Sequence, residues 1–108
     1  MRVYCLKTCD TCRKATKALD AAGIAYDLRD VRADGIAADD IAAILAAHGE
    51  AAINRASTTW RGLSEAEKAQ APAALLAAHP TLLKRPAIEA AGGWLLGWKA
   101  DVQAKVIG

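Results

Sequence analysis

The first thirty residues constrain the fold most, because their hydrophobic pattern changes from that of a strand to that of a helix and back. Residues 1–6 are a short apolar run that contains the strand formers Val and Tyr. Asp10 or Thr11 can then cap a helix that runs to about Ala22. Residues 24–30 alternate apolar and polar side chains, as a strand does. This order predicts a parallel βαβ unit.

The middle of the chain carries helix signals. Asp39 and Asp40 suit the first turn of a helix, because their negative charge faces the positive end of the helix dipole. Ser64 and Glu67 have the spacing of a capping box, in which each side chain satisfies a backbone N–H of the first turn. We therefore predict that residues 37–79 are almost wholly helical.

The pattern changes again after Pro80. Two short apolar segments, 87–90 and 94–97, lie on either side of a glycine-containing turn and predict a pair of strands. A last amphipathic helix follows. The order is βαβ, a helical block, then ββα, and removing the block leaves the arrangement of thioredoxin. We predict an α/β, thioredoxin-like fold with a helical insertion between its two halves.

Length and composition fit one domain. We assign residues 1–108 to it, with the thioredoxin-like core at about 1–34 and 80–108 and the helical insert at about 35–79. The net charge of +2 is too small to indicate nucleic-acid binding. No apolar run could span a bilayer or act as a signal peptide, and three cysteines do not fit a disulfide-stapled secreted protein. We expect a cytoplasmic monomer that binds neither membranes nor nucleic acid.

The pair Cys9 and Cys12 lies between the predicted first strand and its helix. A thiolate is the reactive form, and an ordinary cysteine with a pKa of about 8.5 is mostly protonated at neutral pH. A helix N-terminus and nearby cations lower that pKa, and Lys7, Arg13 and Lys14 are the local cations. Cys9 lies just before the helix and Cys12 within its first turn. We therefore predict that Cys9 is the nucleophile and Cys12 the resolving thiol.

Other interpretations of these cysteines remain open. They could be two inert thiols, or half of a zinc site, although no second pair follows at ligand spacing. With Cys5 they spell CxxxCxxC, the cluster-binding signature of radical SAM enzymes, but the chain is short for such an enzyme. We expect no metal site and expect Cys5 to be a packed core thiol. His48 and His79, at predicted helix ends, suit the negative end of the helix dipole.

Three motifs together resemble the ArsC family. They are CDTCRKA at Cys9–Ala15, NRASTTWRGL at Asn54–Leu63 and HPTLLKRPAIEAAGGWLLGW at His79–Trp98. The family contains glutaredoxin-linked arsenate reductases, YffB-type proteins and Spx-type regulators. The TTWR stretch resembles the YffB-type subgroup most.

The resemblance implies roles for individual residues. Cys9 matches the catalytic cysteine, and Cys12 lies where Spx-type proteins carry the second cysteine of a redox switch. Arg85 matches the arginine of the family's RP motif, and Pro86 its cis proline. Arg55 lies near the first oxyanion-binding arginine of the family.

One position departs from the arsenate reductases. Gly97 stands where they carry a third arginine. Lys99 or Lys84 could replace its charge, but an ammonium does not reproduce the bidentate fork of a guanidinium. The departure argues against arsenate as the physiological substrate.

We therefore expect a thiol-dependent oxidoreductase without a bound cofactor, linked to glutathione or glutaredoxin. Cys9 would attack an oxyanion or a disulfide, Cys12 or glutathione would resolve the adduct, and Arg55 and Arg85 would hold the anionic group. The alternative is an Spx-like, redox-switched regulator that binds the α subunit of RNA polymerase. A third possibility is a relative whose thiols no longer turn over a substrate.

Overall fold

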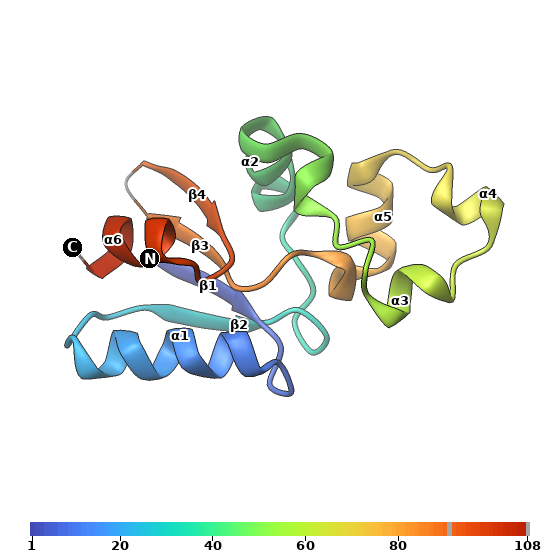
Figure 1. The fold of residues 1–108 in the computed structure, drawn as a ribbon. Helices are drawn as coiled ribbons and strands as arrows, with labels where there is room; N and C mark the ends of the chain where they lie inside the picture. Colours follow the sequence, from blue (N-terminus) through green and yellow to red (C-terminus); the bar gives the residue numbers. More distant parts are fainter. Residues whose placement is uncertain (91, 108) are drawn as a thin grey trace.

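A computed structural model describes residues 1–90 and 92–107 of the chain. Its centre is a four-stranded mixed sheet with the strand order β2-β1-β3-β4 (Figure 1). The strands are β1 (Arg2–Cys5), β2 (Asp27–Asp30), β3 (Ala87–Ala90) and β4 (Gly93–Leu96). β1 pairs with β2 in parallel and with β3 antiparallel, and β3 pairs antiparallel with β4. The predicted parallel βαβ unit and the C-terminal strand pair are confirmed, and so is the α/β, thioredoxin-like fold.

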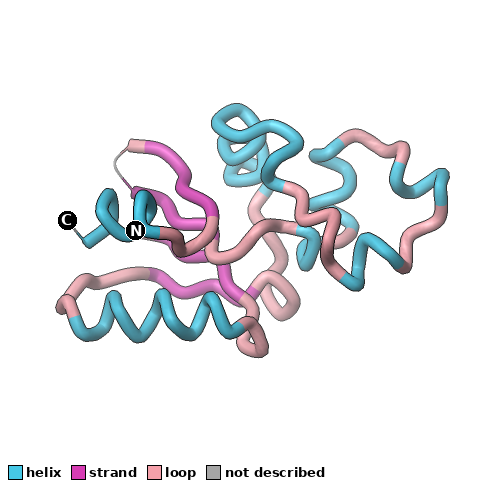
Figure 2. Tube along the Cα trace, viewed as in Figure 1, coloured by secondary structure: helices cyan, strands magenta, loops and turns pink. Residues whose placement is uncertain are grey.

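The helices form two groups, one on each face of the sheet. The helical elements are α1 (Asp10–Ala21), α2 (Ala38–His48), η1 (Gly49–Ala52), α3 (Thr58–Arg61), α4 (Glu65–Lys68), α5 (Pro72–Ala78), η2 (Pro80–Leu82) and α6 (Ala100–Ile107). The helices α1 and α6 lie together at one end of the molecule, and the elements from α2 to η2 form a helical block at the other (Figures 1 and 2).

The alternation of side chains along β1 explains these layers, because successive residues of a strand point to opposite faces. Val3 and Cys5 join a buried cluster with α1 and α6. Tyr4, between them, joins a second cluster with the helical block, where its ring stacks on Trp94 at a centroid distance of 5.8 Å. A single short strand thus supplies both cores, and both are closed by burial of apolar surface.

Several predicted boundaries move by a few residues. The helix α1 begins at Asp10 with Cys9 as its N-cap, so the predicted caps at Asp10 or Thr11 are wrong. The predicted strand 24–30 shortens to β2, because β1 offers only four residues for it to pair with. Tyr26 lies before that strand and hydrogen-bonds to a carboxylate of α1.

The helical block follows its local signals. Ser64 and Glu67 form both bonds of a capping box at the start of α4. Asp39 and Asp40 both lie in the first turn of α2, as predicted, but Asp39 is exposed whereas Asp40 is buried. Contacts with the sheet explain this difference in exposure. Asp40 accepts hydrogen bonds from the guanidinium of Arg2, at 2.7 Å, and from the hydroxyl of Tyr4, so it ties α2 to β1.

Within residues 1–90 and 92–107, the helices are too short and too polar for any of them to cross a membrane.

Candidate active site

Cys9 occupies the N-cap position of α1. Its backbone is extended, with φ −86° and ψ 118°, and its carbonyl accepts the first hydrogen bond of the helix from Arg13. The N–H groups of the first helical turn have no acceptor within the helix, so they favour an anion at this position. The thiol of Cys9 is partly exposed and packs against the edges of both core clusters. These features suit a reactive thiolate.

Cys12, one turn further along α1, is in a different environment. It is 2% exposed. A hydrogen bond with Cys5 and burial together raise the pKa of the Cys12 thiol well above its ordinary value, although a backbone N–H and Cys9 oppose this shift. Cys12 is therefore protonated at neutral pH. Of the two predicted catalytic thiols, Cys9 is the accessible one.

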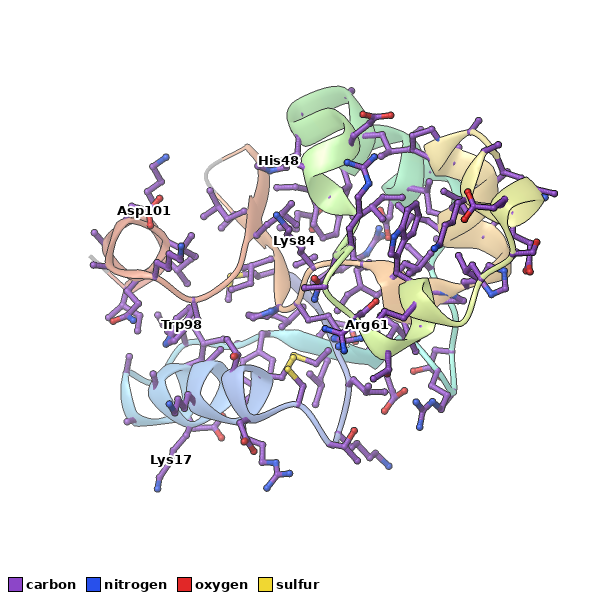
Figure 3. The ribbon with its side chains drawn as sticks, turned by 45° about the vertical axis from the view of Figure 1, so that its right-hand side comes forward. Lys17, His48, Arg61, Lys84, Trp98 and Asp101 are labelled. Atoms are coloured by element: carbon purple, nitrogen blue, oxygen red, sulfur yellow. The ribbon has the colours of Figure 1, made fainter. Side chains whose placement is uncertain are left out.

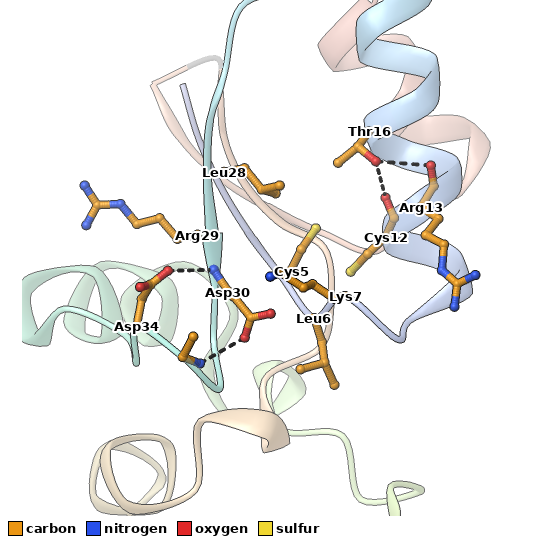
Figure 4. A pocket seen from close by; sticks show the side chains of 11 residues that line it. Cys5, Leu6, Lys7, Cys12, Arg13, Thr16, Leu28, Arg29, Asp30 and Asp34 are labelled. Carbon is orange, nitrogen blue, oxygen red and sulfur yellow. Dashed lines mark hydrogen bonds between the residues drawn. The ribbon is translucent and has the colours of Figure 1, made fainter.

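Cys5 at the end of β1 is 5% exposed, which agrees with its prediction as a core thiol. Cys5 and Cys12 line one cavity of about 440 Å³ between α1 and β2 (Figure 4). All three cysteines are free thiols.

A second and larger space, of about 770 Å³, borders the first turns of α1, and we call it the basic groove. Its walls come from α1, the segment before β3, the end of β4 and α6, together with the end of α2 and the segment after it. Five cationic side chains line it: Lys14, Lys84, Arg85, Lys99 and Lys105. Asp101 is the one acidic side chain among the described lining residues. In Figure 3, Trp98 and Asp101 lie on the α6 side and Lys84 and His48 on the side of the helical block.

Arg85 lines this groove and has a hydrogen-bond donor without a partner among the described residues. Its Nη1 donates to the carbonyl oxygen of Thr81 at 2.8 Å. Its Nε is buried and finds no acceptor among the described residues. The peptide bond from Arg85 to Pro86 is cis, as the resemblance implies. A buried N–H without a partner is costly, so an anionic ligand that reached this nitrogen would gain a charge-assisted hydrogen bond.

Arg55, the other predicted anion-binding residue, lies outside the described lining of the groove. Its guanidinium is 3.5 Å from the carboxylate of Glu50 and lies over the ring of Trp60, 5.5 Å from the centroid. Lys68 approaches the same ring at 5.6 Å. Contact between Arg55 and an anion stays a prediction.

The three cations predicted near the cysteines separate in the fold. Lys14 lines the basic groove. Lys7 and Arg13 instead line the smaller cavity beside Cys5 and Cys12, and Arg13 also pairs with Asp10 at 3.6 Å. The helix start therefore has positive charge on two sides.

Sequence reasoning named Lys84 and Lys99 as substitutes for the third arginine, and both line the groove. It missed Lys105 and Trp98, which have no local signal because α6 reaches the groove only through packing. It also missed the contact of His48, whose Nε2–H donates to the carbonyl of Trp94 and joins α2 to β4.

No cluster of three or more His, Cys, Asp or Glu side chains within residues 1–90 and 92–107 could hold a metal ion.

Known proteins resemble this chain in fold and in sequence. The model of the ArsC family matches residues 4–106. A Haemophilus influenzae protein described as uncharacterized is 38% identical over 101 residues, which cover 89% of each chain. A solved structure described as a YffB protein is 38% identical, with a TM-score of 0.90 over 99% of this chain and 98% of that one. An arsenate reductase (ArsC) related protein from Brucella melitensis is 32% identical, with a TM-score of 0.70 over 95% and 91% of the two chains. These matches span nearly the whole chain, so the chain belongs to the ArsC family.

Proposed function

We propose that the protein is a thiol-dependent oxidoreductase that uses Cys9 as nucleophile and glutathione as co-substrate. Membership of the ArsC family supports a thiol-dependent redox role. One observation favours Cys9 over the other two thiols. It alone combines an N-cap position with exposure to solvent, whereas Cys5 and Cys12 are buried.

The proposed reaction begins with attack of the Cys9 thiolate on a disulfide that contains glutathione. The new bond joins Cys9 to the glutathione sulfur, and the other sulfur of the substrate leaves as a thiolate that takes a proton from solvent. A second glutathione thiolate then attacks the adduct. This step releases oxidised glutathione and restores Cys9, so the net reaction converts one mixed disulfide and one free glutathione into one free thiol and one molecule of oxidised glutathione.

The charge of the basic groove suits such a co-substrate. Glutathione carries two carboxylates, and the groove is lined by one guanidinium and four lysines. Charged hydrogen bonds to a carboxylate are the strong ones in proteins.

The groove suits inorganic arsenate less well. Gly97 has a φ of +83°, and a Cβ placed there would meet no described atom within 4 Å. The groove is therefore open at the position where arsenate reductases carry an arginine. An organic disulfide needs that room, whereas an oxyanion needs the missing guanidinium.

The buried state of Cys12 affects how the adduct is resolved. Since its thiol has a raised pKa, little Cys12 thiolate exists at neutral pH. Glutathione, or a glutaredoxin, is then the faster resolving partner, and Cys12 acts more slowly.

The test is steady-state turnover of a glutathione mixed disulfide and of arsenate by the wild type, Cys9→Ser and Cys12→Ala. We expect Cys9→Ser to lose the disulfide reaction, Cys12→Ala to keep most of it, and arsenate to be the poorer substrate. Equal rates for wild type and Cys9→Ser would remove Cys9 from the mechanism. Faster turnover of arsenate than of the mixed disulfide would remove glutathione disulfides as the preferred substrate.

A further inference from the structure

The proposed reaction leaves Cys5 unused, although it faces a catalytic thiol. Cys5 ends β1, and Cys12 lies in the first turn of α1, which packs on that strand. Both belong to the same buried cluster, and Cys9 lies at the edge of that cluster. Three thiols from one strand–loop–helix segment thus meet at one end of the core.

Two of these thiols line the smaller cavity. It is lined by Cys5 and Cys12 but not by Cys9, and Figure 4 shows both side chains in the space between α1 and β2. Among the described residues it shares no lining side chain with the basic groove. Its polar lining carries both signs of charge: Lys7, Arg13, Arg29, Asp30 and Asp34. Cys5 and Cys12 therefore border a space that is separate from the basic groove, and no cysteine is among the described lining residues of that groove.

We propose that Cys5 is a third redox thiol. It attacks Cys12 in a Cys9–Cys12 disulfide, forms a Cys5–Cys12 disulfide and so returns Cys9 to its free thiol form. The proposal rests on the proposed function, because Cys9 must first be oxidised by its substrate. It assigns the small cavity as the place where a low-molecular-weight thiol reduces the resulting Cys5–Cys12 disulfide.

The electrons balance without an added oxidant. Cys12 first displaces glutathione from Cys9, which forms the Cys9–Cys12 bond and releases glutathione thiolate. The Cys5 thiolate then attacks the Cys12 sulfur, so the Cys5–Cys12 bond forms and the Cys9–Cys12 bond breaks. Cys9 leaves as a thiolate, and the proton of Cys5 passes to solvent. Reduction by two molecules of a small thiol, such as glutathione, gives back both buried thiols and one small disulfide.

The shared surroundings of the two buried thiols support this exchange, because Cys5 and Cys12 belong to one buried cluster and line the same cavity. The hydrogen bond with Cys5 is the largest cause of the raised pKa of Cys12. Both side chains are almost fully buried, so a disulfide between them would form inside the core and leave the groove unobstructed.

The test is a disulfide map of the full-length protein. Reduced protein is incubated with oxidised glutathione at about pH 8.5, where an ordinary thiol is half ionised. The sample is then quenched with acid, alkylated and digested with trypsin. Trypsin cuts after Arg2, Lys7 and Arg13, so Cys5 falls in residues 3–7, and Cys9 and Cys12 share residues 8–13. We expect the two peptides to be cross-linked through Cys12, with Cys9 alkylated.

Three variants control the map. Cys5→Ala and Cys5→Ser should both lose the cross-linked peptide and accumulate the Cys9–Cys12 disulfide within residues 8–13. Thermal melts of both variants will show which of them folds as the wild type does. Cys9→Ser should also lose the cross-link, because neither the glutathione adduct on Cys9 nor the Cys9–Cys12 disulfide that Cys5 attacks can form in this variant.

The outcomes separate this proposal from the proposed function. If wild-type protein shows only Cys9–Cys12 or Cys9–glutathione, the role of Cys5 is wrong but the nucleophile stands. The same holds if Cys9→Ser forms Cys5–Cys12 as fast as wild type does. If Cys9 stays unmodified in every sample, both proposals fail.

Discussion

At the scale of single residues, exposure separates thiols that look equivalent in the sequence. Cys9 and Cys12 are three residues apart, yet one lies at an open helix end and the other is 2% exposed. Arg55 and Arg85 likewise differ from each other, in the partners of their guanidinium groups. The first pairs with Glu50, and the second has a buried Nε–H that meets no acceptor in the part of the chain that the structure describes. Two predictions belong to this scale.

The first prediction concerns pH. Because the pKa of Cys12 is raised above the neutral range, its thiolate fraction grows about tenfold with each pH unit below that pKa. The rate at which Cys12 displaces glutathione from a preformed Cys9 adduct should therefore rise about tenfold per unit from about pH 6 to about pH 9. Release of glutathione measures this rate, and Cys12→Ala is the control. A rate that levels off near pH 7 would mean that Cys12 ionises like an activated thiol.

The second prediction concerns Arg85. Arg85→Ala removes a charge-assisted donor worth about 1.5–3 kcal/mol, so KM for a glutathione mixed disulfide should rise about tenfold to a hundredfold. Arg55→Ala is the matched control and should change KM less than about threefold, since Arg55 already has Glu50 and Trp60 as partners. Similar effects of the two variants would instead place Arg55 at the substrate.

At the scale of elements, a buried polar contact fixes the helical block to the sheet. Asp40 of α2 accepts hydrogen bonds from Arg2 and Tyr4 of β1. The hydroxyl of Tyr4 in turn accepts one from the backbone of Ala37. Burial and the bond with Asp40 raise the pKa of Tyr4, so its hydroxyl stays a donor through the neutral range. The orientation of α2 against the strand therefore depends on one carboxylate.

This contact leads to the third prediction. Asp40→Ala should lower the free energy of unfolding by about 1.5–3 kcal/mol, because a hydrogen bond to a charged group is lost and the buried Tyr4 hydroxyl loses its acceptor. Urea denaturation measures the change. Asp39→Ala removes the same charge from an exposed neighbour, and it should change stability by less than about 0.5 kcal/mol. Equal losses for the two variants would show that helix-dipole charge, rather than the contact with β1, stabilises α2.

At the scale of the whole molecule, charge is distributed unevenly. The chain has a formal net charge of only +2, but five of its cations line the basic groove. These cations come from α1, the segment before β3, and the C-terminal segment that includes α6. Clefts lined by one sign of charge concentrate ligands of the opposite sign. The groove therefore favours anionic ligands although the molecule is nearly neutral.

The fourth prediction compares two charge reversals. Lys99→Glu and Lys17→Glu change the net charge equally, but Lys99 lines the groove whereas Lys17 projects from the far side of α1 (Figure 3). We expect Lys99→Glu to lower kcat/KM for a glutathione mixed disulfide and to weaken its dependence on salt, because a groove cation is lost. Lys17→Glu should leave both unchanged. Equal effects would mean that net charge, not the groove, attracts the substrate.

The sequence by itself determined the features that depend on residues close together in the chain. The order of strands and helices, the capping box at Ser64 and the position of Cys9 at a helix start follow from periods and caps that span a few residues. The motif around Cys9 and the RP motif were sufficient to predict the family.

Only the tertiary structure decided which side chains meet. The burial of Asp40 depends on a strand that lies more than thirty residues earlier in the chain. The cavity shared by Cys5 and Cys12, the separation of Lys14 from Lys7, and the groove lined by α1 and α6 also depend on how the layers pack. Local patterns report the conformation of a segment, but hydrogen bonds and cavities depend on where distant segments come to lie, and a single sequence carries no local signal for that.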